Sequence, residues 1–113
     1  MVISFSVEEA RDQLMNTGTV YTFRWKKRKR TGKNWANEKR GGKKIADVFI
    51  DEPRLIETVS DLTLYVSQSG FNNVKAWLDV IMRMNVPDDM YGFIGYLYKV
   101  TLNSQQLRRD QDV

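Results

Sequence analysis

The chain has 113 residues, 42% of them hydrophobic, a formal net charge of +4, and neither cysteine nor histidine. Without these two residue types it cannot form disulfides or thiolate metal sites, and it lacks the usual zinc ligand, the usual general base and every Ser-His or Cys-His catalytic pair. The length predicts one small domain, and no apolar run approaches the roughly 18 residues of a membrane span.

The first residues, MVISFSVEEARDQL, lack the basic and then apolar order of a signal peptide, so we expect a cytoplasmic protein. We expect neither a metal ion nor a cofactor, because the thiolate and imidazole ligands are missing. An enzyme made from this chain would have to use Lys, Thr, Tyr, Asp or Glu as its reactive groups.

Residues 2–5 (VISF) predict a short first strand. Ser6, with Glu9 three residues later, has the pattern of a capping box and predicts a helix that starts there. Gly18 suits the left-handed position that follows a helix. The apolar face of this helix has the spacing i, i+3 and i+7 at Val7, Ala10 and Leu14.

Residues 19–25 (TVYTFRW) predict a second strand by composition. Its aromatic side chains alternate with smaller and polar ones, so one face is predicted to point to the core and the other to an open surface. The face predicted to be open includes Thr22 and Arg24. The aromatic face consists of Tyr21, Phe23 and Trp25.

Residues 26–44 are predicted to be a long basic connection with glycine turns, either functional or partly mobile. Residues 44–50 (KIADVFI) predict another strand, which Pro53 interrupts. Residues 54–59 (RLIETV) then extend or resume it as an edge.

Two helices follow. The first is predicted as a short helix over 60–70, capped by Ser60 and stopped by Gly70. The second is predicted to begin at Asn72 or Asn73 and to end before Pro87. Its apolar positions match the helical template at Val74, Trp77, Leu78 and Ile81.

Residues 91–102 (YGFIGYLYKVTL) predict a closing strand, in which Gly92 and Gly95 suggest a bulge or bend. We expect a single domain over 1–102 and a polar, frayed tail over 103–113. The order of the elements predicts an α+β fold, a small mixed sheet that is curled or closed into a barrel, with two to three helices packed on its outside.

Three segments resemble the ASCH family of the PUA-like superfamily. SVEEARDQLMNTGTVYTFRW is similar to the family's opening helix and its strand G-x-K-x-x-[ET]-x-R, with Thr22 and Arg24 at the last two fixed positions. NWANEKRGGKKIADVFIDEPR is similar to the barrel strand that follows a basic loop, and VSDLTLYVSQSGFNNVKAWLDVI to the helical pair. Together they cover roughly residues 3–102.

The resemblance implies a small PUA-like mixed β-barrel and RNA binding in a cleft beside it. Some ASCH members are amidohydrolases of acetylated cytidine, thought to use a lysine, a threonine and a glutamate. Thr22 matches the threonine, whereas Thr19 stands at the lysine position and Ser67-Gln68-Ser69 near the glutamate position. We therefore expect a non-catalytic module, with an amidohydrolase that has Thr22 in its site as the alternative.

The positive charge is concentrated in one segment. Eleven basic residues and one acid lie between Arg24 and Lys44, a net +10, whereas the other 92 residues carry a net −6. Such a segment attracts polyanions, so we predict binding to nucleic acid, with RNA favoured over DNA. The predicted binding residues are Thr22, Arg24, Lys26, Lys27, Arg28, Lys29, Arg30, Lys33, Trp35, Lys39, Arg40, Lys43 and Lys44.

Several residues have two interpretations. Trp35 is a candidate for stacking on a base, with core packing as its alternative, whereas Trp77 is predicted to be core. Arg24 either grips a phosphate or base edge or forms a salt bridge with an acid. The run KKRKR also fits a nuclear-localisation signal, and the chain also fits a protein-interaction module or a homodimer formed through an exposed strand edge.

Overall fold

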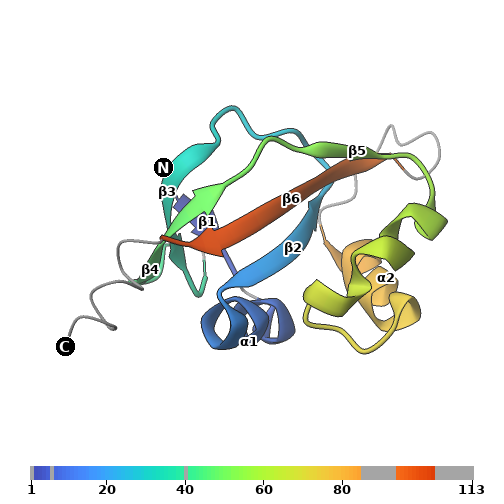
Figure 1. Cartoon of the computed structure of the whole chain (residues 1–113), viewed down its shortest axis with the longest axis horizontal. Helices are drawn as coiled ribbons and strands as arrows, with labels where there is room; N and C mark the ends of the chain where they lie inside the picture. The colour runs from blue at the N-terminus through green and yellow to red at the C-terminus, as the bar shows by residue number, and fades with distance from the viewer. Residues whose placement is uncertain (1, 6, 40, 85–93, 104–113) are drawn as a thin grey trace.

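The computed structural model of the chain describes residues 2–5, 7–39, 41–84 and 94–103. Figure 1 shows one curled sheet, with α1 and α2 drawn below β2 in this view. The strands are β1 (Val2–Ser4), β2 (Thr19–Arg24), β3 (Gly32–Asn37), β4 (Lys44–Ile50), β5 (Arg54–Ile56) and β6 (Gly95–Leu102). The helices are α1 (Glu8–Thr17), α2 (Val74–Arg83) and two 3-10 helices, η1 (Val59–Leu64) and η2 (Val66–Gln68).

The sheet is mixed and has the order β1-β3-β4-β6-β2, with β5 also paired to β6. β1 and β3 run parallel, and the other neighbouring pairs are antiparallel. The sheet curls into a half-barrel, so its end strands approach each other and the Arg24 guanidinium on β2 donates to the Ser4 carbonyl oxygen on β1. The predicted α+β fold, with a curled mixed sheet and helices outside it, is confirmed.

Two apolar clusters fill the two sides of the sheet. The first lies inside the curl, where α1 contributes Leu14 and β6 contributes Tyr98 and Val100. The second lies on the opposite face of β2 and β6, where Phe23 and Trp25 pack edge to face with ring centroids 5.0 Å apart. The other buried members of this second cluster are Ile56, Leu62, Trp77, Ile81 and Leu97.

The first helix begins differently from the prediction. Its N-cap is Val7, which makes no side-chain capping hydrogen bond, so the predicted cap at Ser6 is wrong; Ser6 itself lies outside the described residues. Val7 packs against the inner cluster, and Glu8 and Glu9 place negative charge at the positive end of the helix dipole. Packing and charge therefore set this boundary. The predicted end is confirmed, because Gly18 has φ 87° and donates to Leu14.

The predicted basic connection over 26–44 contains a strand, β3, so that prediction is wrong. β3 pairs with β1 on one side and β4 on the other, and Asn34, Ala36 and Asn37 are buried. Pairing on both sides satisfies its backbone, although its sequence, GKNWAN, has no alternation of apolar residues. A β-bulge lies between Ala36 and Asn37.

The helical predictions are partly confirmed. The segment predicted as one helix over 60–70 forms two 3-10 helices, and Thr58 caps the first in a reciprocal box with Asp61, so Ser60 is not the cap. Asn73 caps α2 by accepting from the Ala76 N–H. None of the helices in the described ranges is long and apolar enough to cross a membrane.

The predicted β4 is confirmed, and β5 forms the predicted edge. β6 begins at Gly95, where a Cβ atom would lie 2.1 Å from the Phe23 ring, so glycine serves close packing here. Gly95 pairs with Ile56 of β5 without a register shift, so the suggested bulge at Gly95 is wrong, whereas the alternative of a bend stays a prediction. Gly92, Pro87 and the tail from 104 lie outside the described residues, whereas Asn103 donates its N–H to Asp47.

Candidate nucleic-acid interface and the Arg24 pocket

Thr22 and Arg24 lie on the inner side of the curl rather than on an open face. Thr22 is buried, with an exposed fraction of 8%, and Arg24 is partly buried. Because α2 and η1 cover the opposite side of β2 and the curl encloses this one, both faces of the strand are covered. The prediction of an open face is therefore wrong, although the two residues do line one pocket.

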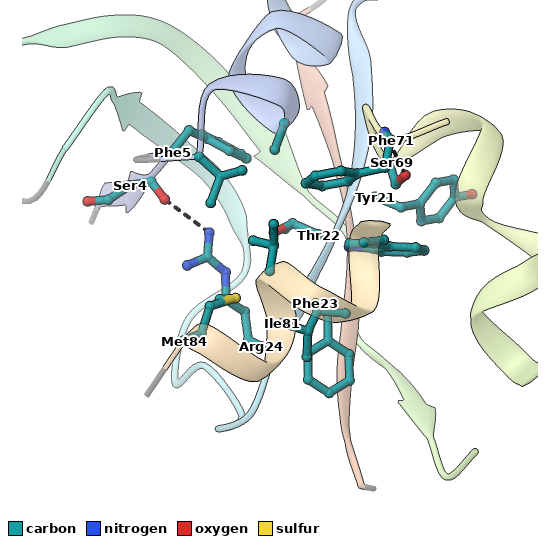
Figure 2. Close-up of a pocket in the computed structure, with 14 residues that line it drawn as sticks. Ser4, Phe5, Tyr21, Thr22, Phe23, Arg24, Ser69, Phe71, Ile81 and Met84 are labelled. Atoms are coloured by element: carbon teal, nitrogen blue, oxygen red, sulfur yellow. Dashed lines mark hydrogen bonds between the residues drawn. The ribbon is translucent and has the colours of Figure 1, made fainter. Parts of the chain in front are cut away.

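Arg24 carries a positive charge that no acid balances among the residues that the structure describes. Figure 2 shows its guanidinium turned towards β1, where Nη2 donates to the Ser4 carbonyl oxygen at 3.0 Å. Its Nε atom is buried and has no hydrogen-bond partner. Within the described ranges no carboxylate lies at salt-bridge distance from Arg24, so the predicted alternative of a salt bridge is not what holds it.

Burial and a second arginine together disfavour the charged form of Arg24. Desolvation is the larger cause and repulsion by Arg28 the next, and they lower the pKa of Arg24 to about 10, against an opposing effect of Tyr98. Burial likewise lowers the pKa of Arg28. The backbone N–H of Arg28 donates to the hydroxyl of the fully buried Tyr98 at 2.6 Å, which holds the segment after β2 against the barrel interior.

The pocket beside Arg24 has a volume of about 60 Å³, room for a few water-sized groups. Its walls come from β1, β2, the turn after η2, α1 and α2 (Figure 2). Among the described lining residues, Arg24 and Tyr21 are the ionisable ones, so Thr22 has no carboxylate or amine beside it in that lining. The described residues also hold no group of three acids suited to a metal ion.

Two polar lining residues, Ser4 and Ser69, were not predicted as site residues. Ser4 contributes only its carbonyl oxygen to Arg24, which no side-chain pattern could reveal. The Ser69 hydroxyl donates to the Val66 carbonyl at 2.7 Å and accepts from the Phe71 N–H at 3.1 Å, so it shapes the turn that forms one wall. Its position at the end of a helical segment and directly before Gly70 was the sequence signal for a side chain that shapes a turn.

The basic segment is divided into two clusters by β3. The first basic cluster is Lys26, Lys27, Arg28, Lys29 and Arg30. The second basic cluster is Lys39, Lys43 and Lys44; Arg40 lies outside the described residues. Because Gly32 pairs with Ile50 and Asn37 with Lys44, the clusters lie at opposite ends of the β3–β4 hairpin, about 20 Å apart along the strand. The prediction of one continuous basic loop is wrong for this reason.

Most of the described cations are exposed and have no acidic partner among the residues that the structure describes. Lys44 forms an ion pair with Asp47, with Nζ and Oδ1 2.6 Å apart, and Arg28 is half-buried. Within the described part of the basic segment, the exposed cations without a carboxylate at salt-bridge distance are Lys26, Lys27, Lys29, Arg30, Lys33, Lys39 and Lys43. These cations outnumber the acids of the same segment, so the hairpin carries a net positive charge.

The three tryptophans have different positions. Trp25 is buried and donates its Nε1–H to the Ile81 carbonyl at 3.1 Å, and Trp77 is buried in the same cluster, as predicted. Trp35 is half-buried on β3. It lies two residues from the exposed Lys33, so both point to the same, outer face of the sheet.

No protein-family model matches the chain, and neither a curated protein nor a solved structure matches it. Two features of the described residues bear on function. Seven cations of the basic segment are exposed and have no carboxylate at salt-bridge distance in the described ranges, and the partly buried Arg24 has neither a counterion nor a partner for its Nε atom among the same residues.

Proposed function

We propose that this protein is a non-catalytic module that binds single-stranded nucleic acid, RNA in preference to DNA. The observation that carries the proposal is the group of exposed cations without acidic partners along the β3–β4 hairpin. Isolated surface charges are common, but a net +10 within 21 residues, opposed to a net −6 elsewhere, polarises the whole molecule. Phosphate backbones are the polyanions that such a field selects.

The separation of the two basic clusters favours an extended ligand over a small one. Each cluster lies at one end of β3, and Lys33 is exposed between them. A strand of phosphates that runs along β3 meets the first basic cluster and Lys33 at one end and the second basic cluster at the other. This length suits an oligonucleotide of at least about four nucleotides, the lower end of the site sizes of single-strand-binding folds.

Arg24 supports the same proposal from inside the fold. Its desolvated charge destabilises the folded protein, because the charged form is disfavoured by burial and by Arg28. A guanidinium with an unpartnered Nε atom is suited to donate hydrogen bonds to a phosphate oxygen or a base edge. The first basic cluster begins two residues after Arg24, so one strand of nucleic acid can reach both.

The preference for RNA and the PUA-like identity of the barrel belong to this proposal. Their supports are the ASCH-like segments of the sequence and the curled mixed sheet with helices outside it. A PUA-like relationship agrees with a ligand cleft between the barrel and its helices, which is where Thr22 and Arg24 meet. A preference for RNA requires that the protein contacts the 2′-hydroxyl.

Binding is tested with fluorescently labelled 12-nucleotide RNA and DNA of the same sequence, by anisotropy at 50 and 200 mM salt. If about five phosphates are neutralised, the affinity is expected to fall roughly a hundredfold between the two salt concentrations. Tighter binding of the RNA supports the stated preference. Undetectable binding of both strands at 50 mM salt overturns the proposal.

Two triple variants that remove the same number of charges locate the interface. K26Q/K27Q/K29Q leaves Arg28 in place, because its side chain is half-buried and its Nε donates to the Arg30 carbonyl, so its replacement could also change the fold. This variant is expected to reduce the slope of log affinity against log salt by about two and to weaken all sequences alike. The control is Arg54→Gln, Lys75→Gln and Arg83→Gln, three exposed residues on β5 and α2. If the control variant loses as much affinity as K26Q/K27Q/K29Q, net charge alone explains binding and this interface is contradicted.

A further inference from the structure

The outer face of the β3–β4 hairpin combines aromatic rings with cations. Lys33 on β3 pairs directly with Phe49 on β4, and residues directly opposite in an antiparallel pair share a face. Trp35 is two residues from Lys33 and lies on the same face, diagonal to Phe49. Thr101 of β6 pairs with Phe49 from the other side. We call this surface of Lys33, Trp35, Phe49 and Thr101 the outer aromatic face.

Phe49 is exposed although its neighbours are core residues. Val48 and Ile50 have exposed fractions of 0%, whereas that of Phe49 is 45%. The alternation of β4 directs Phe49 away from the inner cluster, and within the described part of the chain it makes no contact with another aromatic ring. A phenylalanine ring exposed to water near the end of a strand offers a flat apolar surface to a ligand.

We propose that unpaired bases of a single-stranded nucleic acid stack on Phe49 and Trp35, while Lys33 and the two basic clusters contact the phosphates on either side. This inference rests on the proposed function and adds the surface and the mode of recognition. Every base has a π-face, so stacking on aromatic rings beside a cationic track binds single strands with little sequence preference. The bases of a duplex are already stacked on one another and cannot reach these rings.

The positive charge around the outer aromatic face favours a nucleic acid as its ligand. Lys33 lies directly beside Phe49 across the strands, and the basic clusters lie at both ends of the same hairpin. Asp47, which pairs directly with Trp35 on this face, forms an ion pair with Lys44. An apolar partner surface gains nothing from so many desolvated lysines, whereas a phosphate backbone places an anion beside each ring.

The first test compares Phe49→Ala with Leu64→Ala, which removes another exposed apolar side chain, 77% exposed and located on η1. We expect Phe49→Ala to weaken binding of a 12-nucleotide single strand about tenfold or more at fixed salt. The salt slope and the weaker affinity for a 12-base-pair duplex should not change, because no phosphate contact is lost. Leu64→Ala should bind both ligands like the wild type.

The second test uses tryptophan fluorescence to detect a base stacked on Trp35, and its variant keeps an aromatic ring on the outer aromatic face. Trp25 and Trp77 are buried, so a stacked base is expected to quench Trp35 alone. Trp35→Phe should retain most of its affinity and lose the quenching caused by the unlabelled oligonucleotide.

The outcomes separate the two proposals. If the wild type binds single strands with the expected salt dependence, but Phe49→Ala behaves like Leu64→Ala and the quenching persists in Trp35→Phe, the stacking inference is overturned and the proposed function stands. If the wild type binds no oligonucleotide at 50 mM salt, the proposed function fails and the inference fails with it. Equal weakening of single strand and duplex by Phe49→Ala also contradicts stacking.

Discussion

Arg24 on β2 and Lys33 on β3 carry the same charge on one sheet, but the fold treats them in opposite ways. Arg24 faces the inside of the curl, bonds to the Ser4 carbonyl and has its pKa lowered to about 10, mainly by burial. Lys33 faces outwards, is exposed and touches no acid among the described residues. The charge of Arg24 is hydrogen-bonded within the fold, whereas the charge of Lys33 is exposed to solvent.

A basic residue that is counted in a sequence can therefore contribute to the fold, to the binding of a ligand or to both. On the inner side, polar groups are fixed by neighbours, so substitutions there should change stability. On the outer hairpin, side chains have few contacts, so substitutions there should change binding and leave stability almost unaltered. Matched pairs of substitutions, one from each side, test this division.

The largest difference is expected between two glycines with positive φ. A Cβ atom at Gly70, in the turn beside the pocket, would lie 2.2 Å from the Glu9 carbonyl oxygen of α1, whereas at Gly41, in the β3–β4 turn, nothing lies within 4 Å. Gly70→Ala should destabilise the protein by about 3 kcal/mol or more through this clash, and Gly41→Ala by about 1 kcal/mol through backbone strain alone. Urea denaturation measures both, and equal losses would contradict the division.

The next pair consists of two serines two residues apart. Ser69 is fully buried and bridges the Val66 carbonyl and the Phe71 N–H, whereas Ser67 is exposed. Ser69→Ala leaves a buried N–H without a partner and should cost about 2 kcal/mol, and Ser67→Ala should change stability by less than about 0.5 kcal/mol. Thermal unfolding followed by circular dichroism distinguishes the two variants. If Ser69→Ala loses less stability than Ser67→Ala, water replaces the Ser69 hydroxyl and this prediction is wrong.

The smallest effect has the opposite sign. Arg24→Met keeps most of the side-chain volume, removes a desolvated charge and loses the bond to Ser4, so it should stabilise the protein by about 1 kcal/mol. Lys33→Met, on the outer face, should change stability by less than about 0.5 kcal/mol. If Arg24 also contacts the ligand, Arg24→Met should bind single strands more weakly despite its greater stability. Destabilisation of Arg24→Met by more than 1 kcal/mol would identify Arg24 as a structural link between β2 and β1.

The pH dependence of the Arg24→Met gain follows from the lowered pKa. The folded pKa of Arg24, about 10, lies below the ordinary value of an arginine, so the folded state loses its proton first as the pH rises. Below pH 10 both states are charged and the folded state bears the full penalty of burial, which declines only as the pH rises above about 10. The gain in Arg24→Met should therefore be the same at pH 7 and pH 9, as measured by denaturation at both.

The elements that can be predicted from the sequence are those whose own residues carry a regular pattern of apolar positions or a cap. Residues 44–50 alternate, α2 repeats its apolar positions at helical spacing, and Asn73 offers a cap, so these elements were predictable. β3 was not, because its burial and pairing come from β1 and β4 rather than from its own side chains. The orientation of Thr22 and Arg24 depends on the curl of the whole sheet, a long-range property that one strand cannot reveal.

The candidate site was predictable to the same extent. The concentration of cations is visible in the composition, but their division into two clusters requires knowledge of β3. Phe49 was not predicted as a site residue, although a signal existed: it lies between Val48 and Ile50, so alternation places it on the face opposite the core. The lack of a counterion at Arg24 is a property of three-dimensional neighbours and has no signal in the sequence.

The strand that pairs with three others in this sheet is also the last described strand to be synthesised. β6 lies between β4 and β2 and pairs with β5 as well. A nascent chain that ends before Gly95 therefore holds β2 and β4 without the strand that joins them, and the curl that encloses Arg24 cannot form. Folding must wait until this segment has left the ribosome, and its pairing with residues far upstream predicts a slow rate, on the order of milliseconds to seconds.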